Sequence, residues 1–183
     1  MKYPIVATTC FAAVLGAGST ANAGGYIGLG FGSDADLGGD LADRFTTEGA
    51  SGGRFSLGQR TGPIAIEASI FGTDMTDTAG TGFSTIALGV DLKYFFGLVG
   101  PIEGYGRIGL NKTWLTAESE GAAELSGRGY DFGAGLQYSF RLLPLAEAAL
   151  WLDFTHQTMD LYGDSSRLTG SAEMLTLGVS IGL

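Results

Sequence analysis

The lone histidine of the chain, His156, stands in the stretch DFTHQTMD and has the clearest capacity for chemistry. A hydroxyl follows two positions later at Thr158, and a carboxylate, Glu173, comes further along the chain. If alternating strands bring these three side chains to one face, the imidazole could activate the hydroxyl for attack on an ester. The plainer alternative is a polar rim at the end of a strand. Because threonine is a rare nucleophile, we expect no catalytic residue here.

A second group of candidate residues is charged. These residues occupy every second position of alternating stretches, which we call one parity, and residues of one parity share a face of a strand. Six members are acidic and three are basic: Arg54, Glu67, Asp91, Lys93, Glu103, Arg107, Asp131, Glu147 and Asp153. If this parity faces the inside of a barrel, the charges must be paired, hydrated or protonated. We therefore expect each basic residue to bridge carboxylates, in a network that fills and rigidifies the interior. The alternative is a narrow, cation-favouring conduit.

Two polar segments are rich in acidic residues. They contain Asp34, Asp36, Asp40, Asp43, Glu118, Glu120 and Glu124. Their spacing does not match the calcium loop of an EF-hand, which needs an acidic ligand at its twelfth position. We expect solvated loops that could meet an extracellular ligand. Weak divalent binding that bridges to lipid phosphates is the alternative, and no metal site or cofactor is predicted.

Charge and length limit the class of protein. The 183 residues include 19 acidic and 10 basic side chains, which give a formal net charge of −9. Such an acidic chain lacks the basic patches that nucleic-acid binding requires. The first 23 residues have the pattern of a secretory signal peptide: one lysine, an apolar run, and an A-x-A cleavage site that ends at Ala23.

A cleaved leader leaves residues 24–183 as one mature domain. The apolar run is shorter than the roughly 18–20 residues that a membrane-spanning helix needs, which argues against a membrane anchor. Cleavage also removes Cys10, the only cysteine. We therefore expect neither a disulfide nor a cysteine-based metal site in the exported protein.

The elements that must position these residues alternate with a period of two. Eight stretches, such as GYIGLGFG, TIALGVDLKYF and YDFGAGLQYSF, place large apolar side chains on one parity and small or charged ones on the other. Pro63, Pro101 and Pro144 mark three short turns. Long polar connections are expected at about 33–49, 73–82, 115–127 and 157–170. This alternation of short and long connections predicts an up-and-down meander.

The sequence therefore predicts an all-β fold, an eight-stranded antiparallel up-and-down transmembrane β-barrel. Apolar residues make up 45% of the chain without a run long enough for a spanning helix, as expected where only alternate residues face lipid. The 32 glycines leave room for charged side chains inside a narrow barrel. A secreted, soluble lipocalin-like barrel is the alternative, but these glycines would form a poor solvated outer face.

Four stretches carry a resemblance to a known family: MLTLGVSIGL, GYGRIGLNKTW, DFGAGLQYSF and AALWLDFT. They resemble the OmpA-like eight-stranded outer-membrane barrels. The resemblance implies location in a bacterial outer membrane, with lipid and lipopolysaccharide as partners. It also implies that the barrel-assembly machinery reads the terminal strand, through Leu175, Leu177, Val179, Ile181 and Leu183. Family members usually end on an aromatic residue, and we expect no peptidoglycan-binding domain here.

The resemblance bears on function as well. Some members gate a pore with an inward glutamate on the third strand, and Glu67 matches that position. Asp91, Gln137 and Ala149 stand near the positions of its partners, so the switch is not reproduced. Lipid A deacylases, similar in their histidine motif, have serine where this chain has Thr158. We expect a structural or surface-interaction role, with a small-solute channel as the alternative and an esterase that uses His156 as a further one.

Overall fold

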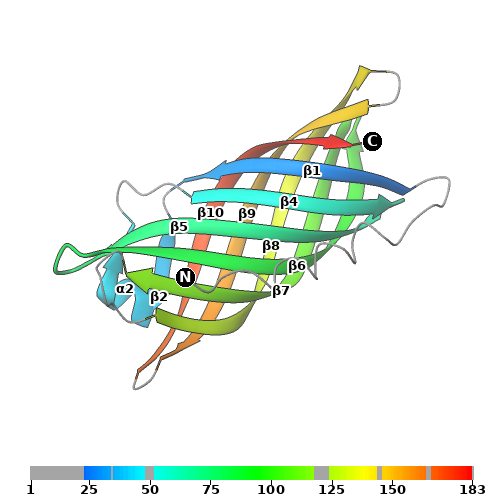
Figure 1. The fold of residues 1–183 in the computed structure, drawn as a ribbon. Coiled ribbons are helices and arrows are strands. Elements are labelled where there is room, and N and C mark those ends of the chain that lie inside the picture. The colour runs from blue at the N-terminus through cyan, green and yellow to red at the C-terminus, as the bar shows by residue number, and fades with distance from the viewer. Residues whose placement is uncertain are drawn as a thin grey trace.

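The structure, a computed structural model, describes residues 23–33, 35–47, 52–117, 124–143, 146–163 and 166–182. Within these ranges, eight antiparallel strands form a closed ring, because β1 pairs with both β4 and β10 (Figure 1). The strands are β1 (Ala23–Gly32), β4 (Gly52–Thr61), β5 (Ile64–Asp77), β6 (Gly82–Val99), β7 (Ile102–Ala117), β8 (Glu124–Leu143), β9 (Ala146–Tyr162) and β10 (Arg167–Gly182). The predicted eight-stranded up-and-down barrel is confirmed. Leu183 lies outside the described residues.

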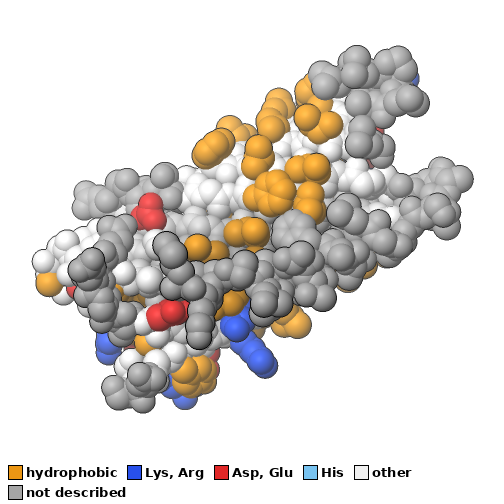
Figure 2. Space-filling view, viewed as in Figure 1, with side chains coloured by type: hydrophobic (Ala, Val, Ile, Leu, Met, Phe, Trp, Pro, Cys, Tyr) orange, Lys and Arg blue, Asp and Glu red, His pale blue; other side chains and the backbone are white. Residues whose placement is uncertain are grey.

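Side chains of one parity form an apolar belt around the barrel. Successive residues of a strand point to opposite faces, so alternate apolar residues gather on the outside. Exposed members include Ile27, Leu29, Phe31, Ile66, Val90, Leu92, Ile108, Leu110, Phe132, Leu136, Leu177 and Val179. Figure 2 shows apolar side chains gathered over the middle of one face. An exposed apolar surface of this extent is suited to lipid and not to water.

The pairing register fixes the tilt of the strands. Following directly opposed residues once round the ring from Val179 on β10 leads back to β10 at Thr169, ten residues away. The opposed residues are Leu29, Phe55, Ile70, Leu88, Lys112, Arg128 and Asp160. A stagger of this size in eight strands requires them to lean from the barrel axis, by about 35–45°. This lean is visible in Figure 1.

Short connections gather at one end of the barrel, which we call the turn end. Gly62 and Gly100 have φ values of 60° and 59°, and each is followed by a proline. This positive φ is open to glycine at little cost, and proline fixes the next residue of the turn. Two of the predicted proline turns are thus confirmed, and Pro144 lies outside the described residues.

The opposite end, which we call the loop end, differs from the expectation of long polar loops. The strands extend into the ranges 73–82, 115–127 and 157–170, so these expected boundaries are wrong. Threonine-rich segments continue the period of two there, since threonine favours strands. The first connection also carries β2 (Asp36–Gly39), α2 (Asp40–Arg44) and β3 (Phe45–Thr46). β2 pairs with β10, and β3 pairs with β5.

No helix in the described part of the chain is long and apolar enough to cross a membrane.

Candidate functional site: the barrel interior

An apolar cluster closes the loop end of the interior. Inward residues near the ends of β5, β7, β9 and β10 meet Leu41 of α2, which is 1% exposed. The buried members are Ala35, Leu41, Met75, Leu115, Met159, Leu161, Leu168, Ala172 and Met174. The inward parity is therefore apolar at this end, although it is charged in the middle of the barrel. We call these residues the loop-end plug.

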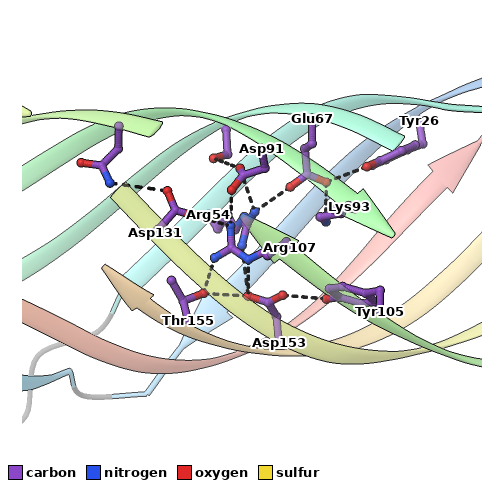
Figure 3. A network of polar contacts seen from close by, with 12 residues as sticks. Tyr26, Arg54, Glu67, Asp91, Lys93, Tyr105, Arg107, Asp131, Asp153 and Thr155 are labelled. Atoms are coloured by element: carbon purple, nitrogen blue, oxygen red, sulfur yellow. Dashed lines mark hydrogen bonds and ion pairs between the residues drawn. The ribbon is translucent and has the colours of Figure 1, made fainter. Parts of the chain in front are cut away.

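A network of buried ions fills the middle of the interior. On one side, Arg54 of β4 contacts Glu67 of β5 through Nη2 and Oε1 at 2.6 Å, and Lys93 of β6 contacts Oε2 of Glu67 at 2.6 Å. Arg54 also reaches across the lumen to Asp153 of β9, 3.2 Å away. Figure 3 shows these side chains pointing toward one another from different strands. Because all four are buried, each charge depends on its partners for the hydration that it has lost.

Arg107 of β7 joins the other half of this network. Its Nη1 lies 2.7 Å from Asp91 and 3.1 Å from Asp131, and its Nε lies 3.3 Å from Asp153 (Figure 3). The second Nη donates to the hydroxyl of Thr155. One guanidinium thus holds carboxylates from β6, β8 and β9. The lumen network consists of Arg54, Glu67, Asp91, Lys93, Arg107, Asp131 and Asp153.

Two tyrosines that sequence reasoning did not place in the site complete the network. Tyr26 donates to Oε2 of Glu67 at 2.8 Å, and Tyr105 donates to Oδ2 of Asp153 at 2.8 Å. Lys93 also lies 5.0 Å from the centre of the Tyr105 ring. Both tyrosines share the inward parity of the charged residues, and this signal was available in the sequence.

Glycines create the space that the large inward side chains occupy. A Cβ added at Gly30 or Gly178 would collide with the ring of Trp151, and one at Gly58 would collide with Tyr26. At Gly109 the collision would involve the carboxylates of the lumen network. The high glycine content is therefore a requirement of packing, because strands of a narrow barrel can enclose aromatic and charged groups only opposite small residues.

Two of the nine charged candidates lie apart from the lumen network. Glu103 binds Arg60, with both carboxylate oxygens 2.7 Å from the guanidinium. The Arg60 guanidinium stacks 4.0 Å from the centre of the Phe95 ring. Glu147 is exposed near the turn end. These residues line a cavity of about 850 Å³ that opens at the turn end, which we call the vestibule.

The space within the lumen network itself is small. A gap of about 20 Å³ lies among Arg54, Arg107, Asp131, Thr155 and Gln157. That volume holds about one water molecule. The interior therefore changes along the axis from an open vestibule, through tightly packed ions, to an apolar plug.

The candidate catalytic group has one of the contacts that an esterase would need. His156 Nδ1 lies 2.9 Å from Glu173 Oε1, and its ring stacks on Phe132 with centroids 4.7 Å apart. The hydroxyl of Thr158 instead donates to the backbone oxygen of Tyr130 and accepts from the backbone nitrogen of the same residue, both at 3.0 Å. A hydroxyl engaged in this way serves as a bridge between β8 and β9.

Of the acidic loop residues, Asp40 has a defined anchoring role. Its Oδ2 accepts hydrogen bonds from the backbone nitrogen and the hydroxyl of Thr169, both at 3.0 Å, which tie α2 to β10. These bonds lower the pKa of the Asp40 carboxyl below its usual value. Asp34, Glu118 and Glu120 lie outside the described residues. In the part of the chain that is described, no group of three or more His, Cys, Asp or Glu side chains could hold a metal ion.

The terminal strand places the expected assembly residues on the lipid-facing side. Leu175, Leu177, Val179 and Ile181 are each about half exposed. The inward residues between them, Thr176, Gly178 and Ser180, are small or polar, and this strand closes the ring against β1. Recognition by an assembly machinery stays a prediction.

Comparison with known proteins identifies the fold. No family model matches the chain, and no curated protein sequence matches it. Neisserial surface protein A has a similar structure, with a TM-score of 0.59, 13% identity, and coverage of 85% of this chain and 95% of that one. The outer membrane protein AlkL gives a TM-score of 0.55 at 13% identity and covers 100% and 96% of the two chains.

OprG from Pseudomonas aeruginosa, an outer membrane protein, has a TM-score of 0.50 at 12% identity and covers 90% of this chain and 96% of its own. At such identities the likeness concerns the fold and does not extend to residues of a site. Ring closure, strand number and the outward apolar belt agree with it. The chain has the fold of the small eight-stranded outer-membrane β-barrels.

Proposed function

We propose that this protein is a closed barrel of the bacterial outer membrane with a structural or surface-interaction role. The observation that supports this most directly is the blocked interior. Every member of the lumen network is less than 10% exposed, and the loop-end plug lies beyond it. A solute entering the vestibule would have to break several buried ion pairs before it met an apolar barrier. The surfaces left for function are the belt and the loop end.

A narrow channel is the second candidate, and the vestibule favours it. About 850 Å³ of space reaches from the turn end to the Arg60–Glu103 pair. This pair is only partly buried, with side-chain exposures of 28% and 25%, so it could rearrange more easily than the lumen network. A channel would further require the lumen network to exchange partners and the plug to move. Glu67 already binds two cations, Arg54 and Lys93, which gives it partners to exchange.

Planar-bilayer recording on the refolded barrel separates the two candidates. We expect no conductance steps from protein that migrates as a compact barrel before heating in a gel and as an unfolded chain after boiling. Steady single-channel steps from the same preparation would overturn the closed-barrel proposal and establish the channel. Refolded protein that has been boiled provides the control for leaks caused by detergent.

The proposal includes the absence of esterase activity. Its support is the Thr158 hydroxyl, which is held by the backbone of Tyr130 and has no bond to His156 among the described contacts. Mass spectrometry of lipid A incubated with wild-type protein and with His156→Ala should show unchanged acylation in both. Loss of an acyl chain with the wild type alone would overturn this part of the proposal.

A further inference from the structure

Two cations stand side by side on the outer wall of the barrel. Lys112 of β7 is directly opposed to Arg128 of β8, and both side chains are exposed. Directly opposed residues have Cβ atoms about 4.5–5.5 Å apart, and like charges in such a pair destabilise a sheet. The chain as a whole is strongly acidic, with a net charge of −9. Two adjacent cations therefore form a local positive patch on an acidic protein, and an anion bound between them would offset their mutual repulsion.

Within the described residues, neither cation has a carboxylate partner. Asp160 is the residue of β9 opposed to Arg128, but both of its oxygens accept hydrogen bonds from Arg167 at 2.9 Å. One of them also accepts from the hydroxyl of Tyr162 at 2.5 Å. The Lys112 ammonium lies 4.8 Å from the centre of the Trp114 ring. The pair thus has an aromatic neighbour and unused hydrogen-bond donors.

The position of this pair relative to the belt indicates the kind of anion. Two residues before Lys112 on the same face stands Leu110, which is 73% exposed, and the residue opposed to Leu110 is Tyr130, which is 56% exposed. On the side toward the loop end the outward residues are Trp114 and Thr116 on β7 and Ser126 and Glu124 on β8, so one aromatic ring is followed by polar side chains. Barrels of this kind have their short turns on the periplasmic side and their longer connections outside. In that orientation Lys112 and Arg128 lie at the outer border of the apolar belt, where the headgroups of the outer leaflet would lie.

We propose that Lys112 and Arg128 together bind a phosphate group of a phosphorylated glycolipid of the outer leaflet. The ammonium and the guanidinium bracket the phosphate, because charge-assisted hydrogen bonds from two donors suit its oxygens. The acyl chains of the same molecule lie over Leu110 and Tyr130. This inference rests on the proposed location in an outer membrane and names one partner of the barrel surface.

Lipid binding by the detergent-solubilised barrel tests the proposal. Native mass spectrometry measures the Kd for phosphorylated lipid A with the wild type, with Lys112→Gln/Arg128→Gln, and with the control Arg44→Gln/Arg141→Gln. The control removes the same number of charges from other exposed positions. We expect at least about a tenfold weaker Kd for the first variant, equivalent to about 1.4 kcal/mol, and less than about a twofold change for the control.

A second series varies the lipid. Removal of its phosphates should weaken binding by the wild type to the level of the Lys112/Arg128 variant and erase the difference between them. Equal binding of dephosphorylated lipid A, an unchanged Kd in that variant, or an equal loss in the control would overturn the proposal. Inorganic phosphate that binds the wild type as tightly as the lipid would do so too. Heat-modifiable gel migration of each variant verifies that the barrel is folded, and conductance of the same samples tests the closed-barrel proposal separately.

Discussion

Replacement of Arg107 by methionine provides the sharpest test of the lumen network. Methionine keeps most of the length of the side chain and removes its charge and its donors. In the described structure, the wild-type network sets three cations against four carboxylates, and the variant sets two against four. Asp91, Asp131 and Asp153 each lose a partner that lies within 3.3 Å. Because these three carboxylates are buried, little water can replace the lost guanidinium.

The expected loss of stability is large. Removing one partner of a buried ion pair costs about 3–5 kcal/mol, because the charge that remains is left without compensation. Small domains have a total unfolding free energy of about 5–15 kcal/mol, so this loss would be a considerable fraction of it. The matched control is Arg60→Met, which breaks a pair whose side chains are about a quarter exposed. Partly hydrated pairs contribute about 0.2–1 kcal/mol, so the control should lose that much.

Urea unfolding in lipid vesicles measures both variants through the fluorescence of the two tryptophans. Trp151 reports on the interior directly, since its side chain is buried there. The double variant Arg107→Met/Asp91→Asn should lose less than the sum of the single losses, since the two residues are in contact. Equal losses for Arg107→Met and Arg60→Met, or strict additivity in the double variant, would show that Arg107 does not compensate the buried carboxylates.

Three further outcomes are expected. Gly178→Ala should lower the unfolding free energy by about 1–3 kcal/mol and reduce the yield of folded barrel, because the added methyl group collides with Trp151. The control Gly53→Ala, whose methyl group meets nothing within 4 Å, should show the gel migration of the folded wild type. Ile108→Arg, in the exposed belt, should cost about 2–4 kcal/mol in vesicle unfolding, while Thr116→Arg on the same face of β7 should cost about 0–1, and equal costs would contradict the placement of the belt. Because the pKa of Asp40 is lowered in the folded state, its bonds to Thr169 stabilise the loop end above the usual value of 3.8 and are lost as pH falls below it. The protection of the α2 amides, taken relative to their intrinsic exchange rate at each pH, should then fall at acid pH in the wild type but should already be low at neutral pH in Asp40→Asn.

The ring of strands could be predicted because the period of two survives in the sequence wherever lipid meets the wall. GYIGLGFG and TIALGVDLKYF show it without ambiguity. At the loop end the alternation reverses in places, since inward residues such as Leu115 and Leu161 are apolar while outward neighbours such as Thr116 and Asp160 are polar. Read by composition, these segments resemble loops. The extra strands and the short helix of the first connection depend on contacts with β10 and β5 that are distant in sequence.

Parity also selected candidates for the interior, but it could not assign partners to them. The parity of a residue indicates whether it faces inward or outward, but it does not indicate its position along the barrel axis. Glu103 and Glu67 are therefore equivalent by parity. In the structure, Glu103 meets Arg60 beside the vestibule, while Glu67 lies deeper between Arg54 and Lys93. The roles of Tyr26 and Tyr105 also depend on position along the axis, because their hydroxyls donate to carboxylates that lie at the same level on other strands.

The stagger of ten residues is a property of the whole ring, and the seam between the two ends of the chain completes it. The other seven pairings join strands that follow one another around the meander, whereas β1 and β10 meet only when the sheet curls up. Their seven opposed pairs, Tyr26–Gly182 to Gly32–Thr176, select the final stagger. A shift of the β1–β10 register by one residue would move the lipid-facing side chains of one strand to the interior. A shift of two residues would preserve the faces but change the tilt of all eight strands and the diameter of the barrel. The diameter of this barrel therefore depends on the register of the strand pairing in the ring with the fewest opposed residues, β1 with β10, whose residues are also the farthest apart in the sequence.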